Sequence, residues 1–281
     1  MRKKSYFCIL KIVELMKRMI LFAAAVLLSA TMMAQAYQDR FDAALSAGNI
    51  QQQRQVLAEW VVDAPEDIDC YIARYNYFVN YIGEEASRLA DEAQFATLAP
   101  IADSAFAVID EAIGRYPNRL DLRFGKIYFL GVLRQWDAFA DEILATLNHS
   151  EGIEHLWSFP NMDGGMVDVV TESMLDYQST MFDAVDNWDQ PTAGDTAMML
   201  RIRKVAKRTV QLFPRDIASV NILATTYTFF KEYESAIKYL QRAERIDPND
   251  PVVLKNMRDV YDLMGKKKQA KQYQDRMKNL E

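Results

Sequence analysis

Two histidines and the carboxylates between them are the residues of this chain best suited to metal chemistry. His149 and His155 stand six positions apart around Glu151 and Glu154, and imidazole and carboxylate groups are both zinc ligands. Six residues do not place two side chains on one face of a helix, and a glycine between them favours a loop. A metal-dependent hydrolase centred on 149–200 is therefore a hypothesis that the residue types allow and the spacing disfavours.

Other chemical signatures are missing from the sequence. It contains no His-Glu-x-x-His, no Gly-x-Ser-x-Gly and no glycine-rich phosphate loop. The aspartates around Trp188 lack the alternating oxygen ligands and central glycine of a calcium loop. Cys70 stands in a predicted helix, where it fits a buried small hydrophobe better than a reactive thiol. The sequence thus predicts no catalytic residue, no metal ligand and no cofactor, and a protein that is not an enzyme.

The first 36 residues have the pattern of a signal peptide. A Lys-Arg pair precedes an apolar run at 19–28, and Ala-Gln-Ala at 34–36 supplies the small residues that signal peptidase recognises. We therefore expect 1–36 to be a leader and Tyr37 to be the first residue of the mature protein. Met16 is an alternative start, which would leave a leader of ordinary length.

An uncleaved membrane anchor is the alternative for this segment, but its apolar run is shorter than the roughly 20 residues that a spanning helix needs. No later segment is long and apolar enough to cross a bilayer, so no membrane span is expected after leader removal. Loss of Cys8 would leave Cys70 alone, which excludes an internal disulfide. These features predict export to the periplasm or cell envelope of a Gram-negative bacterium.

Charge is divided unevenly along the chain. Residues 37–200 hold 9 basic and 28 acidic side chains, whereas 201–281 hold 18 and 10, so the net charges are −19 and +8. The acidic total argues against nucleic acid as a partner. Opposite charges can attract within one molecule or pair head to tail between molecules. A second functional hypothesis is therefore a structural subunit of an envelope assembly, or a self-associating protein. The alternative is that the lysines near the C-terminus form a solvated face that serves solubility and binds no partner.

The elements that must position any functional residue are clearest in 220–248. Close helix crossings need short side chains, and the space around them needs large apolar ones. The short residues are Ala224, Ala236 and Ala243, and the large ones are Leu223, Tyr227 and Leu240. Pro248 cannot continue a helix and ends the unit. This spacing resembles the tetratricopeptide repeat, a helix-turn-helix unit of about 34 residues, although the family's Trp near Val220 is absent and Lys231 or a neighbour replaces its turn Gly.

Weaker copies of the unit extend the pattern in both directions. The prolines that end second helices would be Pro65, Pro117, Pro214 and Pro248, at intervals of 52, 97 and 34 residues. Only the last pair is in strict register, so the middle of the chain is expected to hold longer helices or insertions. Residues 254–281 form a last unit with a lysine-rich outer helix, as a capping repeat requires.

The fold expected from these observations is all-α. Half of the residues are hydrophobic, glycine and proline number 10 and 8, and alternating runs typical of strands are absent. The resemblance implies a right-handed α-solenoid of tetratricopeptide-like helix-turn-helix repeats, irregular in the middle. The expected regions are the leader (1–36), degenerate N-terminal repeats (37–150), an irregular helical insertion or linker (151–200), and C-terminal repeats with a capping helix (201–281).

The resemblance also implies a binding surface, because inner helices of such arrays line a concave groove. Here these helices would expose Asn221, Thr225, Thr228, Phe229, Lys255 and Asp259. The expected partner is a protein or peptide. The lysine and asparagine arrangement by which chaperone-linked relatives hold a C-terminal carboxylate is not reproduced, so that ligand is not expected.

A second set of candidate contacts lies in 151–200. Trp157, Phe159 and Trp188 stand near prolines in predicted loops, where we expect them to be exposed. The methionines and other aromatics of this region suit helix packing as well as an adaptable surface. The first functional hypothesis is therefore a non-enzymatic, exported tetratricopeptide scaffold or adaptor that binds protein or peptide partners in the cell envelope.

Overall fold

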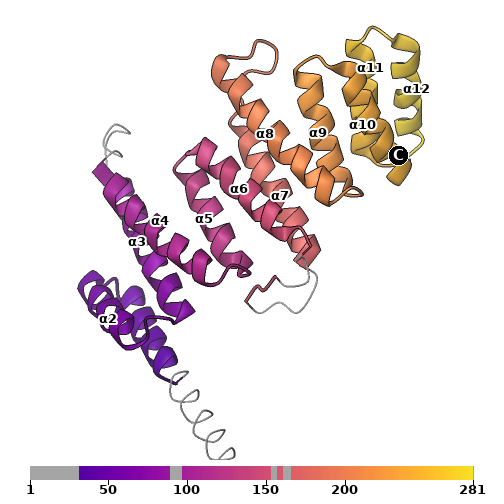
Figure 1. Cartoon of the computed structure of the whole chain (residues 1–281). Coiled ribbons are helices and arrows are strands. Elements are labelled where there is room, and N and C mark those ends of the chain that lie inside the picture. The colour runs from indigo at the N-terminus through magenta and orange to yellow at the C-terminus, as the bar shows by residue number, and fades with distance from the viewer. Residues whose placement is uncertain (1–31, 89–96, 153–156, 161–165, 281) are drawn as a thin grey trace, which may run out of the picture. The chain divides into compact units, whose positions relative to one another are not determined.

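The computed structural model describes residues 32–88, 97–152, 157–160 and 166–280 (Figure 1). Over these residues the fold is all-α, and the helices pack in pairs as a solenoid of tetratricopeptide type. An isolated bridge between Arg119 and Ser158 is the strand-like pairing seen in the described part. No helix in this part combines the length and the apolar character that crossing a bilayer requires. The chain divides into two compact units, Met1–Pro117 and Asn118–Glu281.

The first unit is built around a tryptophan-centred core. Its helices are 32–46, α2 (Ile50–Asp63), α3 (Ile68–Arg88) and α4 (Ala99–Arg115). Trp60 is fully buried, stacks on Tyr37 at 5.6 Å between ring centroids, and donates its indole N–H to Asp67 at 2.9 Å. Cys70 is 2% exposed in the same core. Burial raises the pKa of the Cys70 thiol to about 11, so the thiol behaves as the small hydrophobe that the sequence predicts.

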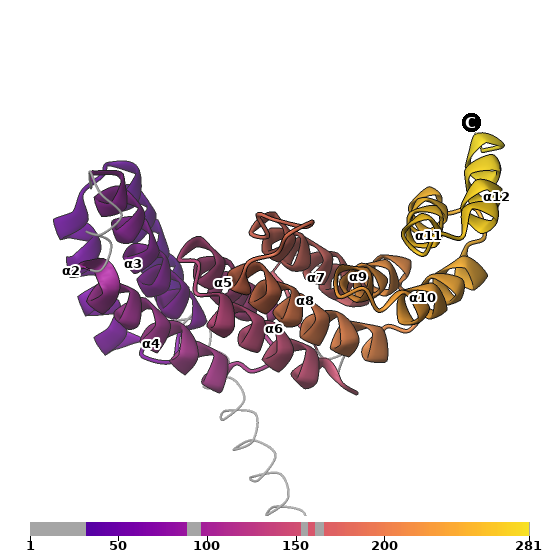
Figure 2. The ribbon, with the colours of Figure 1, turned by 90° about the horizontal axis from the view of Figure 1, so that it is seen from above.

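The second unit stacks helix pairs in two layers. Its helices are α5 (Leu120–Val132), α6 (Trp136–Ser150), α7 (Met166–Asp183), α8 (Ala193–Leu212), α9 (Ile217–Phe229), α10 (Tyr233–Ile246), α11 (Pro251–Leu263) and α12 (Lys267–Lys278). The helices α7, α9 and α11 lie along one side of this unit, and α6, α8 and α10 lie along the other (Figure 2). We call the former the inner helices.

One turn geometry recurs between the helices of a pair. Gly48, Arg134, Lys231 and Gly265 adopt the left-handed conformation, with φ of 62°, 53°, 59° and 72°. The residue after each donates its N–H to the carbonyl five positions earlier at 2.9 Å, which closes a Schellman motif. Lys231 thus occupies the turn position where the family has glycine, at a cost of about 1 kcal/mol. The same helix-turn-helix unit therefore occurs in both parts of the chain.

The prolines expected to end helices do so. Pro65, Pro117, Pro214 and Pro248 each stand two residues beyond the end of α2, α4, α8 or α10. The residue before each proline donates its N–H to the carbonyl four positions earlier, at 2.7 to 3.1 Å. That bond completes the last helical turn, and the proline then prevents another one.

Small residues occupy the helix crossings, as predicted. Ala236 and Ala243 are fully buried on α10, which packs against α9 and α11. Ala224 of α9 is 1% exposed. Between α5 and α6 the crossing is tighter still, because a Cβ added at Gly131 would lie 2.9 Å from the ring of Phe139. These contacts set how closely the helices of a pair approach.

Two predicted boundaries differ from the observed division. The helices α5 and α6 belong to the second unit, whereas the sequence assigned them to N-terminal repeats ending at 150. The boundary at 200 falls inside α8, which begins at Ala193 because Thr192 and Asp195 form a capping box. The described part of 151–200 contains α7 and the start of α8, which pack on each other as a pair.

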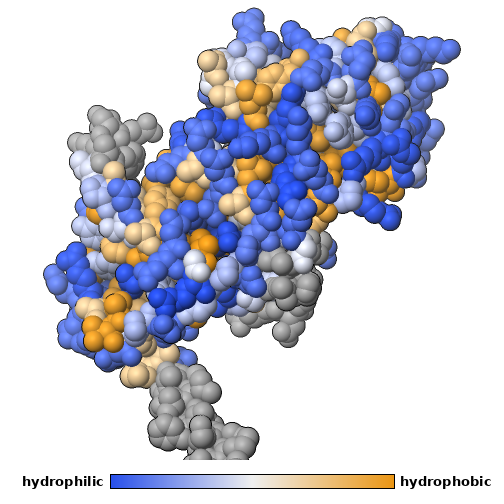
Figure 3. Space-filling model, viewed as in Figure 1, coloured by the Kyte–Doolittle hydropathy of each residue, from blue (hydrophilic) through white to orange (hydrophobic). Residues whose placement is uncertain are grey.

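Surface polarity agrees with the composition. The face seen in Figure 3 is covered mainly by hydrophilic residues, and hydrophobic ones lie in separate small patches. Single exposed apolar side chains are ordinary on such a surface. On this face, binding surfaces are therefore sought in grooves and clusters of side chains rather than in one broad apolar area.

Candidate binding groove

A groove with a volume of about 660 Å³ opens between the three inner helices α7, α9 and α11 of the second unit. The side chains that matter for its chemistry are Leu175 from α7, Ala218, Asn221 and Thr225 from α9, and Val252 and Asn256 from α11. The wall is thus apolar with amide and hydroxyl groups placed among the aliphatic side chains. Such a surface suits an extended peptide, whose backbone is polar and whose side chains vary.

Regular helix starts give the groove its register. Asp216 accepts a hydrogen bond from the N–H of Ser219 at 2.8 Å, and Asp250 accepts one from the N–H of Val253 at 2.8 Å. These aspartates are the N-caps of α9 and α11 and stand 34 residues apart. The two inner helices therefore begin at equivalent points, and equivalent positions on them face the same groove.

Amide groups from two successive inner helices meet in the groove. Asn256 donates from Nδ2 to Oδ1 of Asn221 at 3.3 Å. Thr225 donates its hydroxyl to the carbonyl of Asn221 at 3.0 Å, which leaves the hydroxyl oxygen able to accept. Asn221 is 6% exposed, so it presents little of its surface to solvent. The arrangement can donate and accept hydrogen bonds, but it pairs no nucleophile with a base.

The sequence-predicted groove residues divide into two groups. Asn221 and Thr225 line the groove. Thr228 donates its hydroxyl to the carbonyl of Ala224 at 3.0 Å, and Phe229 contacts Trp188 beyond the groove lining. Their role in partner binding stays a prediction.

The two α11 residues predicted to face the groove, Lys255 and Asp259, are not among its lining residues. They form an ion pair with each other at 3.2 Å, and the lysine side chain is 58% exposed. Asn256, one position after Lys255, lines the groove instead. It stands 34 residues after Ile222, which also lines the groove, so α11 keeps the period of the repeat. Applying that period to Ile222 would have found Asn256.

The three aromatic residues predicted to be exposed differ in their environments. Trp157 is 5% exposed, so its predicted exposure is wrong: its indole N–H donates to the hydroxyl of Ser150 at 3.1 Å, and Arg123 lies over its ring. Phe159 is half-buried against Phe124. Trp188 is 47% exposed, as predicted. A neighbouring proline thus signalled a loop correctly, but it did not determine which way the side chains point.

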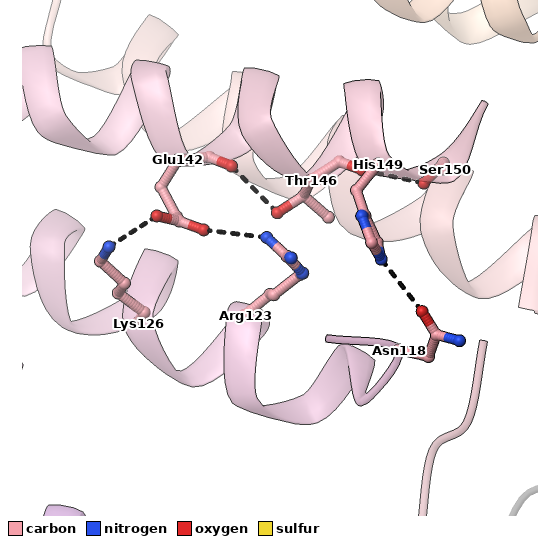
Figure 4. A network of polar contacts seen from close by, with 7 residues as sticks. All are labelled: Asn118, Arg123, Lys126, Glu142, Thr146, His149 and Ser150. Carbon is pink, nitrogen blue, oxygen red and sulfur yellow. Dashed lines mark hydrogen bonds and ion pairs between the residues drawn. The ribbon is translucent and has the colours of Figure 1, made fainter. Parts of the chain in front are cut away.

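His149 takes part in a half-buried polar network rather than a metal site (Figure 4). Its Nε2 lies 3.0 Å from Oδ1 of Asn118, and burial together with the Arg123 guanidinium lowers the pKa of His149. Glu142 contacts Lys126 at 2.7 Å and Arg123 at 3.5 Å, all three with side chains at most 18% exposed. The network joins α5 to α6, because Arg123 and Lys126 lie on α5 and Glu142 lies on α6.

The other predicted metal ligands do not complete a site in the described part of the chain. His155 and Glu154 lie outside the described residues. Glu151 accepts a bond from Arg208 at 2.7 Å. Over the described ranges no three His, Cys, Asp or Glu side chains are grouped so that they could hold a metal ion.

Part of the charge asymmetry is neutralised between α6 and α8. Arg201 pairs with Asp137 at 2.6 Å, Lys204 with Asp141 at 3.2 Å, and Arg208 with Glu151 at 2.7 Å. The acidic partners are 67–83% exposed, so solvent screens each pair and the pair contributes little to stability. The three ion pairs therefore align α6 with α8 more than they stabilise the packing of these helices.

Residues 218–250 match the family model of the tetratricopeptide repeat. The chain carries a tetratricopeptide repeat. No curated protein matches it. Similar solved structures include YrrB, described as a tetratricopeptide protein with an unusual peptide-binding site (TM-score 0.43, 12% identity, 80% of this chain and 92% of that one). Another is the type IV pilus biogenesis factor PilW, with a TM-score of 0.40 and 10% identity over 88% of this chain and 93% of that one. A third is MamA from Desulfovibrio magneticus RS-1, with a TM-score of 0.41 and 12% identity over 74% of this chain and 94% of that one.

Proposed function

We propose that this protein is a non-enzymatic scaffold of the cell envelope, which holds an extended segment of a partner protein in the groove between α7, α9 and α11. The observation that carries the proposal is the groove itself, in which Asn221, Thr225 and Asn256 stand among aliphatic side chains from three successive inner helices. Tetratricopeptide repeats are scaffolds that bind other proteins, and the repeat at 218–250 supplies the central wall of this groove.

The chemistry of the groove suits binding rather than turnover. The carboxylates at its rim, Asp216 and Asp250, are engaged as helix caps. The amides and the threonine hydroxyl can bond a peptide backbone, and Val252, which is 53% exposed, offers apolar contact to a side chain. Backbone bonding gives affinity for an extended chain, and the side-chain contacts select its sequence.

A selection from a random dodecapeptide library displayed on phage tests the proposal. Peptides selected on the full chain should bind it in fluorescence anisotropy, and Thr225→Arg, which places a long cation in the groove, should weaken binding about 10-fold or more. Gln241→Arg is the matched control, because Gln241 is exposed on α10 away from the inner helices. Equal losses in the two variants, or no selected peptide at all, would overturn the proposal.

The envelope location rests on the leader pattern at 1–36, and residues 1–31 lie outside the described ones. Tyr37 is 7% exposed and packs on Trp60, so the helical core begins where cleavage is expected to end. Expression in a Gram-negative host, followed by fractionation and terminal peptide mass spectrometry, should find a chain starting at Tyr37 outside the cytoplasm. An intact leader on a cytoplasmic chain would contradict this part.

Self-association is the second candidate, and the last helix favours it. Lys266, Lys268, Lys271 and Lys278 are exposed, and within the described residues no ion pair holds them. The acidic region 37–200 of a second copy is a complementary surface. Sedimentation at low salt should then show a dimer or larger species, which Lys268→Glu with Lys271→Glu disperses. A monomer at high concentration in low salt would exclude it.

A further inference from the structure

An exposed tryptophan stands beside the groove and is held in one orientation. Trp188 is 47% exposed and lies in the segment between α7 and α8. Its ring stacks on Phe182, with 5.7 Å between centroids and 16° between planes, and meets the ring of Phe229 edge-on at 5.7 Å. Phe182 is the residue before the last of α7 and Phe229 is the last of α9, so two inner helices together support this ring.

The carboxylate of Asp195 accepts hydrogen bonds from both ends of the segment that carries Trp188 and so fixes its position. Asp195 is 4% exposed and accepts hydrogen bonds from the N–H of Asp186 at 2.9 Å and from the N–H and hydroxyl of Thr192 at 2.8 and 2.7 Å. These bonds lower the pKa of Asp195, so it stays ionised and keeps its acceptors. Val185 is 6% exposed and anchors the same segment by packing. The exposure of Trp188 is therefore a fixed feature.

A second layer of rings lies beneath the tryptophan contact. Phe229 meets Phe230 at 5.1 Å, and the Arg203 guanidinium lies 4.2 Å from the Phe230 centroid and 4.5 Å from that of Tyr227. Arg203 also pairs with Glu232 at 2.8 Å. A partner side chain that docks on Trp188 thus meets a rigid platform and causes little loss of conformational entropy in the protein.

The platform continues the groove along the same helices. On α7, Phe182 follows the groove residue Leu175 by seven positions, a rise of about 10 Å, and on α9 Phe229 follows Thr225 by four, about 6 Å. An extended peptide rises about 3.3 Å per residue, so roughly three residues span this distance. One peptide can therefore occupy the groove and reach Trp188.

The surroundings of the platform are acidic. The exposed carboxylates on α7 and the following segment are those of Asp168, Glu172, Asp176, Asp183, Asp186 and Asp189. Across the described residues none of these six side chains is held in an ion pair. Two exposed cations belong to the same surface: Lys231, in the turn after α9, and Arg215, which lines the groove. Because the carboxylates outnumber them, the net charge of this surface is negative. The field therefore attracts a basic segment and repels an acidic one.

We propose that Trp188, Phe182 and Phe229 form a subsite at the end of the groove that takes an aromatic or large aliphatic side chain from an extended, basic segment of the partner protein. This inference rests on the proposed function and adds the class of sequence that the groove selects. The aromatic platform supplies the anchor, and the carboxylates of α7 and the following segment supply complementary charge.

Peptide selection on two forms of the full chain tests the inference. Dodecapeptides selected from a random phage library on the wild-type chain should be enriched in Trp, Phe or Leu three to four positions from the groove-bound residues, and in Lys and Arg. Selection on Trp188→Ala should lose the apolar enrichment. A selected peptide should bind Trp188→Ala about 10-fold or more weakly, while thermal unfolding of the variant stays close to that of the wild type.

Charge reversal and a groove variant separate this inference from the proposed function. Asp186→Lys with Asp189→Lys should weaken binding of the basic peptide and strengthen that of a version with Glu in place of each Lys and Arg. If Thr225→Arg abolishes binding but Trp188→Ala leaves it unchanged, the subsite is refuted and the groove stands. Selection of acidic peptides would also refute it. If no variant changes binding, the proposal that the peptide binds in the groove is refuted as well.

Discussion

The packing of α10 can be tested by putting one charged residue at a helix crossing. Ala236 is fully buried on α10, where this helix packs against α9 and α11. Ala236→Glu adds four heavy atoms at that point, three of which are the atoms of a carboxylate. Overpacking of a tight site costs about 1–3 kcal/mol, and an unpaired buried charge adds several kcal/mol more, roughly 3.

These terms together predict a loss of about 4 kcal/mol or more, which lowers Tm by about 8–16 °C for a unit of this size. Far-UV circular dichroism during heating measures the shift, because the signal comes almost entirely from helix. Lys267→Ala is the control. Its side chain is 77% exposed and its ion-pair partner Asp262 is 55% exposed, so a change within about 0.5 kcal/mol is expected. Equal shifts in the two variants would refute the packing argument.

Three further predictions concern buried polar groups. Glu142→Gln removes the carboxylate shared by the buried Arg123 and the half-buried Lys126, and it should lower the free energy of unfolding in urea by about 3 kcal/mol; a change below about 0.5 kcal/mol would show that the network contributes nothing. Because burial lowers the pKa of His149, the unfolded chain binds more protons below about pH 6.5, and stability should fall as pH drops from 7 to 5. His149→Gln should make the loss of stability between pH 7 and 5 smaller, and an unchanged dependence of stability on pH would contradict the assignment to His149. In a Cys8→Ser chain at pH 8, a pKa of about 11 should make Cys70 react with a disulfide reagent about 100-fold more slowly when folded than when unfolded; similar rates would place Cys70 at the surface.

The local structure of the repeats was predictable because its causes are local. A proline prevents the helix before it from continuing, and Pro65, Pro117, Pro214 and Pro248 each follow the end of a helix. Short side chains at Ala236 and Ala243 signal a close crossing, since no larger residue fits there. The left-handed turn at Lys231 had no direct signal in the sequence, because the glycine that marks this turn in the family pattern is replaced.

The placement of the site depended on contacts between segments far apart in the sequence. Asn256 lines the groove because α11 packs beside α9, which brings the amides of Asn221 and Asn256 together. The direction of each aromatic side chain in 151–200 was equally undetermined, so Trp157 lies buried under Arg123 while Trp188 stays exposed.

The sequence by itself determined the helical class, the ends of most repeats and the alanine crossings, because each follows from the shape or backbone chemistry of a few neighbouring residues. Tertiary structure decided which polar side chains share a groove, which histidine joins a buried network, and which tryptophan remains available to a partner. Those outcomes depend on the rotation of one helix against another. That rotation is set by packing summed over many residues, and no short stretch of sequence encodes it.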